Sequence, residues 1–590
     1  NTTGSTGSGG ALDANNSRLT FASCTFASNV SQLEGGAINS QNSALIFSNS
    51  SFTSNQNASS NGGGALNISG GSLSDINGTY SNNSCAPGSG GGAIQWAGID
   101  ANFTGTTFNA NQSASYRGGA IIATTGALRF SKCVFSGNTS GARGGAVRGE
   151  SVVLSFSNSN FTSNESAING GALSAENAIL TLTGNTFTSN KSEYHGGALD
   201  AKDSNLTTTN CHFTSNLTGN NGKGGAVAVE NGFWNDSGSF FTSNISVWQG
   251  GAVSWKNATG SMVGSTFSSN SNTTYNGGGA LHLEGTMPTI SNCFFLGNEA
   301  ESGGALMLAN NANSMSFVNC VFSGNKAVNH GGVLKGDGST RFVNCSLAGN
   351  SANYGGVTIL FSGASVSFEN SILWGNIATA GGSDVFVNSE TATASYSLFD
   401  PSKSTNTLSG SGNLSSDPLF VDADGADNLV GTEDDDLTLQ PSSPAINQAS
   451  SSVSGYSTTD LLGKARSGTP DLGAYEYRIN AAPIFAQGAT AALSILEDSN
   501  GSFTYSATDA DADTLTWSML SPASNGIASV VGSSGVTSYV PNADWSGSDS
   551  FVVQVFDGVL TDEITVSVTV SSVADSPVIT QGGGPLVLSM

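Results

Sequence analysis

The chain has 590 residues, 30 of them Phe, and a formal net charge of −25 at pH 7. This acidic balance argues against nucleic acid as a partner, because a phosphate backbone requires a basic protein face. Only 10% of the residues are charged, which leaves apolar surface for a core, yet no apolar run is long enough to cross a membrane as a helix.

Residues 1–385 repeat two short words. The first word is a Gly pair followed by a small and an aliphatic residue, as in "GGALDA" after His195. The second is an aromatic residue, two further residues and Asn, as from Phe187 to Asn190. The Gly pair recurs about every 26 residues from Gly9 to Gly381, which indicates a repeat architecture.

Apolar and polar residues alternate within each repeat, as where Leu281 and Leu283 flank His282. This period of two is typical of strands rather than helices. Several short strands per repeat, without helices, predict a parallel β-helix with one repeat in each of about 15 coils. The fold class is therefore all-β.

The repeated residues have expected roles in such a solenoid. Gly adopts positive φ and allows close approach of stacked backbones, so the Gly pairs suit sharp corners. The recurring Asn suits a left-handed corner, and in register its side chains could form a hydrogen-bonded ladder. The aromatic residues would form a column of rings in the interior.

The seven Cys include no CxxC motif, and the four His are scattered, so neither a disulfide scaffold nor a structural zinc site is expected. Six of the Cys lie two residues before the aromatic or Leu position of the second word, which predicts inward-facing free thiols. The last three are on consecutive coils, where pairing is the alternative. The six are Cys24, Cys133, Cys211, Cys293, Cys320 and Cys345.

Charges in the solenoid look sparse. Asp13 and Asp200 share the slot after the aliphatic residue, but other coils place Ser174 or Lys335 there. No pair of coils is expected to bring acids and bases together, so we do not expect an enzyme. Tyr116, Tyr194 and Trp248 each lie two residues before a Gly pair and are candidates for stacking against sugar rings, with packing in loops as the alternative.

Residues 386–478 break the period and are predicted to cap the β-helix, since a solenoid end exposes strand edges. An acidic loop lies in this segment. Its closely spaced carboxylates around a Gly suit Ca²⁺, which prefers several oxygen ligands, although a solvated acidic loop is the alternative. The candidate ligands are Asp422, Asp424, Asp427, Glu433, Asp434 and Asp436.

Residues 479–575 change character again. Alternation in "FVVQVFDG" and "ITVSVTVSSV", with regular turns, predicts one β-sandwich. Residues 576–590 are interpreted as the start of a further, truncated module of the same chain. We therefore expect a fragment from which an export signal and an anchor are missing.

Three segments resemble known families. The words GGA[ILV] and FxxN resemble the repeats of chlamydial polymorphic outer membrane proteins, which implies a right-handed parallel β-helix and a surface adhesin. Residues 386–478 resemble the closing segment of bacterial secreted β-helix proteins. Residues 479–575 resemble bacterial cadherin-like, Ig-type tandem modules. That last resemblance implies Ca²⁺ ligands that stiffen the joint between modules, at Glu497, Asp509, Asp511, Asp513 and Asp575.

These features predict an extracellular or outer membrane-associated bacterial adhesin: a β-helix presented on cadherin-like modules stiffened by Ca²⁺. Its partner would be a glycan, the extracellular matrix or another cell surface. The alternatives are a secreted polysaccharide lyase or glycoside hydrolase, and a passive spacer of the cell surface.

Overall fold

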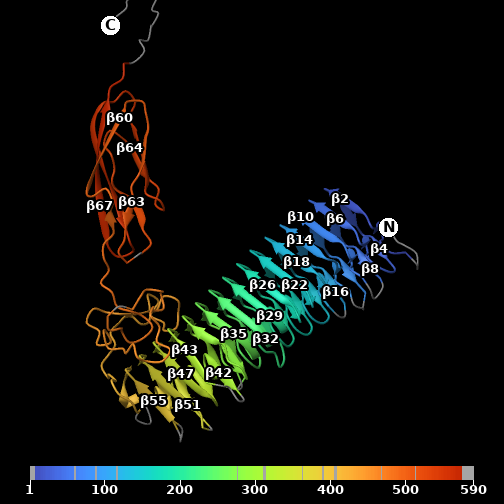
Figure 1. Cartoon of the computed structure of the whole chain (residues 1–590), viewed down its shortest axis with the longest axis horizontal. Helices are drawn as coiled ribbons and strands as arrows, with labels where there is room; N and C mark the ends of the chain where they lie inside the picture. Colours follow the sequence, from blue (N-terminus) through green and yellow to red (C-terminus); the bar gives the residue numbers. More distant parts are fainter. Residues whose placement is uncertain are drawn as a thin grey trace, which may run out of the picture. The chain divides into compact units, whose positions relative to one another are not determined.

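The computed structural model of the chain describes two compact units, residues 1–477 and 478–590 (Figure 1). Apart from one 3-10 turn at Pro401–Lys403, the regular structure of the described residues consists of strands. The described residues are 7–58, 62–86, 90–114, 117–274, 277–309, 314–361, 363–387, 391–403, 408–466, 468–511 and 513–574.

The first unit is a parallel β-helix, as predicted from the repeats. One coil contains β25 (Leu173–Glu176), β26 (Ile179–Thr183), β27 (Thr186–Thr188) and β28 (Lys191–Ser192). Each strand pairs in parallel with its equivalent on the next coil, as Phe161 of β23 (Asn160–Thr162) pairs with Phe187.

The stacked strands form three long sheets. One has 15 strands, from β3 (Thr25–Ala27) to β56 (Leu398–Phe399), and a second has 14, from β4 (Val30–Ser31) to β53 (Ile377–Gly381). The third has 27 strands, because two columns of strands merge where single strands span both of them. The merging strands are β29 (Leu199–Thr209), β32 (Val227–Ser237) and β35 (Val253–Val263).

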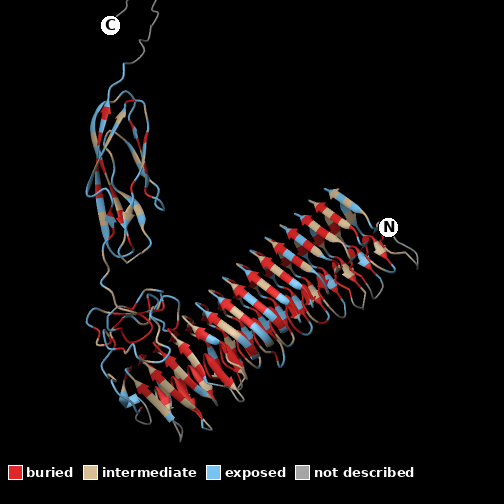
Figure 2. Cartoon of the chain, in the orientation of Figure 1, coloured by how far each residue is buried: buried red, intermediate tan, exposed pale blue. Residues whose placement is uncertain are grey.

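Aromatic rings stack along the interior of the solenoid. Phe161 and Phe187 lie with ring centroids 4.6 Å apart and planes 5° from parallel, and the same arrangement links every aromatic residue of the second word from Phe26 to Phe322. Buried residues occur along the strands of the stack, although β2 (Arg18–Ala22) and β3 in the first coil contain none (Figure 2). The column supplies the apolar burial that a thin solenoid needs.

The Asn of the second word forms the expected ladder, but not the expected corner. Asn190 donates from its backbone and side-chain nitrogens to Oδ1 of Asn216, each at 3.0 Å, and from Nδ2 to the carbonyl oxygen of Phe161. Positive φ occurs instead at the preceding residue, such as Ser189 at φ 55°. The ladder Asn is fully buried, so its side chain is committed to the neighbouring coils.

The Gly pair meets both expected requirements. Gly196 has a φ of +62°. A Cβ on Gly197 would lie 1.9 Å from the carbonyl oxygen of Gly225 on the next coil. The first Gly therefore makes the corner, and the second lets the backbones stack.

The seven cysteines are free, and all except the partly exposed Cys24 are buried. Burial raises the pKa of the Cys133 and Cys211 thiols to about 11. The thiols therefore behave as small buried side chains beside the aromatic column.

The coils extend beyond residue 385, the predicted end of the repeats. β54 (Val385–Phe386), β55 (Thr391–Ser395) and β56 pair with the preceding coil, and bridges continue to Leu414. Beyond them, β57 (Phe420–Asp422) and β58 (Asp436–Leu439) form an antiparallel pair.

The segment from Phe420 to Tyr477 packs against the side of the last coils. Its apolar residues share a core with outward-facing side chains of the 15-stranded sheet, namely Leu296, Val321, Ala348, Ile372 and Leu398. Corner Asn residues add hydrogen bonds, as Asn370 does with the backbone of Ser450. The strand edge at the end of the solenoid is instead paired by Lys403 and by residues 408–414, through bonds such as that from the Ala394 nitrogen to the Ser409 oxygen.

The second unit is a β-sandwich, as predicted. One sheet has the order β60 (Thr490–Leu496), β67 (Thr561–Ser571), β66 (Gly547–Phe556) and β63 (Thr516–Ser521). The other consists of β61 (Gly501–Thr504), β65 (Val536–Pro541) and β64 (Gly526–Val530). A short pair, β59 (Ile484–Phe485) and β62 (Ala507–Thr508), completes it, and the core is separate from that of the solenoid.

Candidate functional site

Charged residues gather on one face of the solenoid, over six consecutive coils. Three columns form this face: the residue before the Gly pair, the slot after the aliphatic residue, and the position two residues further on. We call it the charged face. Its charged or titratable residues are Arg117, Arg143, Arg148, Glu150, Glu176, His195, Asp200, Lys202, Lys223, Glu230 and Lys256.

This grouping contradicts the expectation that no pair of coils brings acids and bases together. In the slot after the aliphatic residue, three consecutive coils hold Arg148, Ser174 and Asp200. This column alone does not show that acids and bases lie together. The chain turns at the Gly pair, so the residues just before the pair lie beside the residues of the strand that follows it. The ion pair between Arg143 and Glu176, at 3.0 Å, joins these two columns. Only the three columns together reveal the cluster.

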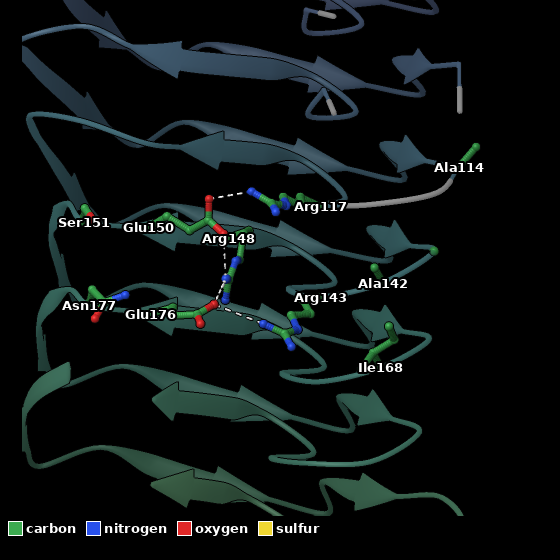
Figure 3. Close-up of a pocket in the computed structure, with 11 residues that line it drawn as sticks. Ala114, Arg117, Ala142, Arg143, Arg148, Glu150, Ser151, Ile168, Glu176 and Asn177 are labelled. Carbon is green, nitrogen blue, oxygen red and sulfur yellow. Dashed lines mark hydrogen bonds and ion pairs between the residues drawn. The ribbon is translucent and has the colours of Figure 1, made fainter. Parts of the chain in front are cut away.

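The first part of the charged face is an arginine–glutamate network around a pocket of 1010 Å³ (Figure 3). Arg148 is 1% exposed and forms ion pairs with both Glu150 and Glu176. Arg117 pairs with Glu150, and Arg143 pairs with Glu176. The hydrogen bond from Arg148 lowers the pKa of Glu176, which keeps that carboxylate ionised.

A second pocket, of 280 Å³, lies on the following coils. Asp200, Lys223, Glu230 and Lys256 line it together with His195. Asp200 is 7% exposed and accepts hydrogen bonds from Asn169 and Ser174. Each of these groups projects from the same face of the 27-stranded sheet or from the loop just before it.

Burial perturbs the titration of this second pocket. It raises the pKa of Asp200 to about 6 and lowers the pKa values of Lys223 and His195. Nearby cations lower the latter two further, Lys256 acting on Lys223 and Lys223 acting on His195. Such clusters of perturbed groups in a concave site are typical of functional sites.

Two of the three predicted aromatic residues each contact a residue that lines this pocket. The exposed Trp248 faces Lys223, whose Nζ is 5.8 Å from the ring centroid. The exposed Tyr194 lies edge-on to the ring of His195, which lines the pocket. Tyr116 lies outside the described residues.

The acidic loop at 422–436 does not gather its carboxylates around one point. Asp434 accepts hydrogen bonds from Thr432 and from the backbone of Asp427, and Asp436 accepts two from Thr438. Asp427 accepts one from the Leu429 backbone. Within the described residues, Asp422, Asp424, Asp427, Glu433, Asp434 and Asp436 contribute to no group of three or more close ligands.

The sandwich brings together three of its predicted ligands. Asp509, Asp511 and Asp513 each offer an oxygen within 4.8 Å of the others. Asp509 Oδ1 accepts hydrogen bonds from the Asp511 and Asp513 backbone nitrogens, while its Oδ2 is buried without a hydrogen bond to any described residue. Oxygen donors in this arrangement suit a hard cation such as Ca²⁺.

Glu497 lies elsewhere in the sandwich. It follows the last residue of β60 and accepts a hydrogen bond from the backbone of Val573. Asp511 instead contacts Ala481, which precedes β59. The length of β60, about 20 Å for its six steps, separates these two ends. Asp575 lies outside the described residues.

Comparison with known proteins identifies the second unit. Residues 480–569 match the family model of the bacterial Ig domain. No curated protein matches the chain significantly. Within the described residues, no helix is long and apolar enough to span a membrane. A bacterial Ig domain together with a parallel β-helix fits an extracellular or surface protein.

Solved structures show limited similarity. Drosophila N-cadherin EC1-3 is 14% identical over 16% of this chain and 35% of its own, with a TM-score of 0.14. Human protocadherin-24 EC1-2 is 23% identical over 16% and 44%, also with a TM-score of 0.14. The endo-fucoidan hydrolase MfFcnA4 of glycoside hydrolase family 107 is 21% identical over 17% and 15%, with a TM-score of 0.14. The chain thus spans less than half the length of each of these proteins.

Proposed function

We propose that the chain is an adhesin-like protein of the bacterial surface that binds a polysaccharide or another glycan along its charged face. The observation that carries this proposal is the pair of neighbouring pockets on six consecutive coils, which are lined by charged residues, with the exposed Tyr194 and Trp248 in contact with His195 and Lys223 of the smaller pocket. Guanidinium and carboxylate groups hydrogen-bond sugar hydroxyls, and exposed aromatic rings stack on sugar rings. Repeated weak contacts along a rigid face would supply avidity.

Retention of the whole chain on immobilised acidic and neutral polysaccharides tests this proposal. The double substitution Arg117→Gln and Arg143→Gln should weaken retention several-fold, because both side chains line the larger pocket. Arg129→Gln is the matched control, since its exposed ion pair with Asp100 lies outside both pockets. Retention on none of the polymers would favour the passive spacer instead.

A polysaccharide-degrading activity is the second candidate. The smaller pocket places Asp200, with its pKa raised to about 6, together with the carboxylate of Glu230. Glycoside hydrolysis uses such a pair, one group as a proton donor and one as a carboxylate. Oligosaccharide released in the same wells would support this activity, and Asp200→Asn should then abolish the release.

The Ig domain is proposed to be cadherin-like in binding Ca²⁺, through Asp509, Asp511 and Asp513. Three carboxylates with oxygens within 4.8 Å of one another repel unless a cation neutralises them. Isothermal titration of the whole chain with CaCl₂ should detect a site that Asp511→Asn removes. Glu563→Gln, a substitution on an exposed strand position of the same domain, should leave the binding unchanged.

A further inference from the structure

The smaller pocket owes its existence to one small side chain. In the slot after the aliphatic residue, Asp200, Ala228 and Ser254 stand on successive coils in register. Because the side chain of Ala228 is small, it leaves a gap between Asp200 and Ser254. These two residues form opposite walls of the 280 Å³ pocket. The pocket therefore has the dimensions of a single small ring rather than of a long chain.

The pocket contains polar groups that the protein does not use itself. Ser254 is 4% exposed, and its hydroxyl makes no hydrogen bond within the described part of the chain. Nδ1 of His195 is buried without a hydrogen-bond partner there. Because an unsatisfied buried polar atom is costly, Nδ1 of His195 favours a polar ligand in this pocket.

Lys223 gives the pocket a cation that two carboxylates, Glu284 and Glu230, attract only at longer range. Lys256 across the pocket is neutralised by Glu230 at 3.0 Å, and Arg143 and Arg148 are paired with glutamates. Lys223 forms no ion pair within the described residues, and its ammonium group faces the ring of Trp248. A partly buried ammonium that is not held in a direct ion pair attracts an anionic group.

From this arrangement we infer that the smaller pocket binds a saccharide ring that bears a carboxylate. The carboxylate pairs with Lys223, and the ring lies between Asp200 and Ser254, with Trp248 at its edge. The acids Asp200 and Glu230 accept hydrogen bonds from ring hydroxyls, which a simple inorganic anion lacks. This inference rests on the proposed function, because it specifies the sugar that the charged face recognises.

Titration of the whole chain with trigalacturonate tests the inference, with the methyl ester of the same trisaccharide and inorganic sulfate as ligand controls. We expect trigalacturonate to bind at least about tenfold more tightly than its uncharged ester. Lys223→Gln should cause a similar loss. Ala228→Leu, which fills the pocket without changing any charge, should abolish binding. Lys191→Gln, on another sheet, is the control for net charge and should bind normally.

Equal binding of the acid and the ester, or unchanged binding by both pocket variants, would overturn the inference. Displacement by sulfate at concentrations similar to those of trigalacturonate would also overturn it, since it would indicate a plain anion site. Retention on neutral polysaccharides without any affinity for trigalacturonate would leave the proposed function standing and remove only this inference. Binding of trigalacturonate without retention on any polymer would keep the pocket assignment and remove only the adhesion to polysaccharides.

Discussion

At Asn190, one side chain joins three coils of the solenoid. Its Oδ1 accepts hydrogen bonds from the Asn164 backbone and side-chain nitrogens, and its Nδ2 donates to Phe161 and to Asn216. All three Asn residues are fully buried. The ladder therefore satisfies polar groups that water does not reach.

Removal of this side chain should be costly. Asn190→Ala removes the side-chain partner of the Asn164 backbone N–H and of the Phe161 carbonyl, and one hydrogen bond from each neighbouring Asn side chain, so we expect a loss of about 2–5 kcal/mol in the free energy of unfolding. Denaturant titration followed by circular dichroism measures it. Asn205→Ala, on an exposed position of β29, should change the same quantity by less than about 0.5 kcal/mol. Equal effects of the two substitutions would contradict the stabilising role of the ladder.

At the scale of the element, the second Gly of each pair is a stacking contact rather than a turn. Gly197→Ala places its Cβ 1.9 Å from the Gly225 oxygen, so adjacent coils must separate. We expect a loss of more than about 3 kcal/mol. Gly137→Ala is the control: Gly137 has a φ of +59° but open space around its Cβ, so only the backbone strain of about 1–2 kcal/mol applies. A larger effect at Gly137 in thermal unfolding would refute this distinction.

The end of the solenoid also indicates that the second Gly is needed where another coil stacks on it. In register with Gly355 and Gly356, the last coil has Gly382 and Ser383. Within the described residues, no further Gly pair stacks on Ser383, which explains why a side chain is tolerated there. The next residue, Asp384, takes the place of the small buried residue and accepts a hydrogen bond from Asn376, the last Asn of the ladder, at 3.0 Å.

Asp384 should make the stability depend on pH. Burial raises its pKa from 3.8 to about 7, so the folded state retains a proton that the unfolded state loses, and stability falls as the pH rises from about 4 to 7. The difference corresponds to at most about 4 kcal/mol. Asp384→Asn keeps the acceptor for Asn376 and should raise Tm more at pH 8 than at pH 5. Asp337→Asn, at an exposed position, should raise it at neither pH.

The repeated words were sufficient to predict the stacked strands, the aromatic column and the Asn ladder, because each recurs once per coil and must therefore align. The charged face was not predicted, since His195, Asp200 and Lys223 occupy different slots and meet only through the corner and the register. The lateral packing of residues 420–477 has a signal in the sequence of the last coils. Outward positions that hold Thr186 or Thr266 in earlier coils become Val321 and Ile372 in the last ones.

At the scale of the whole molecule, the solenoid and the Ig domain have separate cores, and we propose different ligands for them. The core of residues 1–477 contains the stacked rings, whereas that of the Ig domain centres on strands β66 and β67. Units with independent cores unfold independently unless a large interface couples them. We therefore expect the melting temperature of each unit to respond to a different change in solution conditions.

Calorimetry of the full chain should accordingly show two transitions. Added Ca²⁺ should raise the Tm of the Ig domain alone, because a ligand stabilises only the unit that binds it, and Asp511→Asn should remove this shift. A change from pH 8 to pH 6 should instead raise the Tm of the solenoid, where burial raises the pKa values of Asp75 and Asp200 to about 6 and that of Asp384 to about 7. A Ca²⁺ shift of the solenoid transition that survives Asp511→Asn would place a cation on the solenoid unit, with the acids at 422–436 as the first residues to substitute.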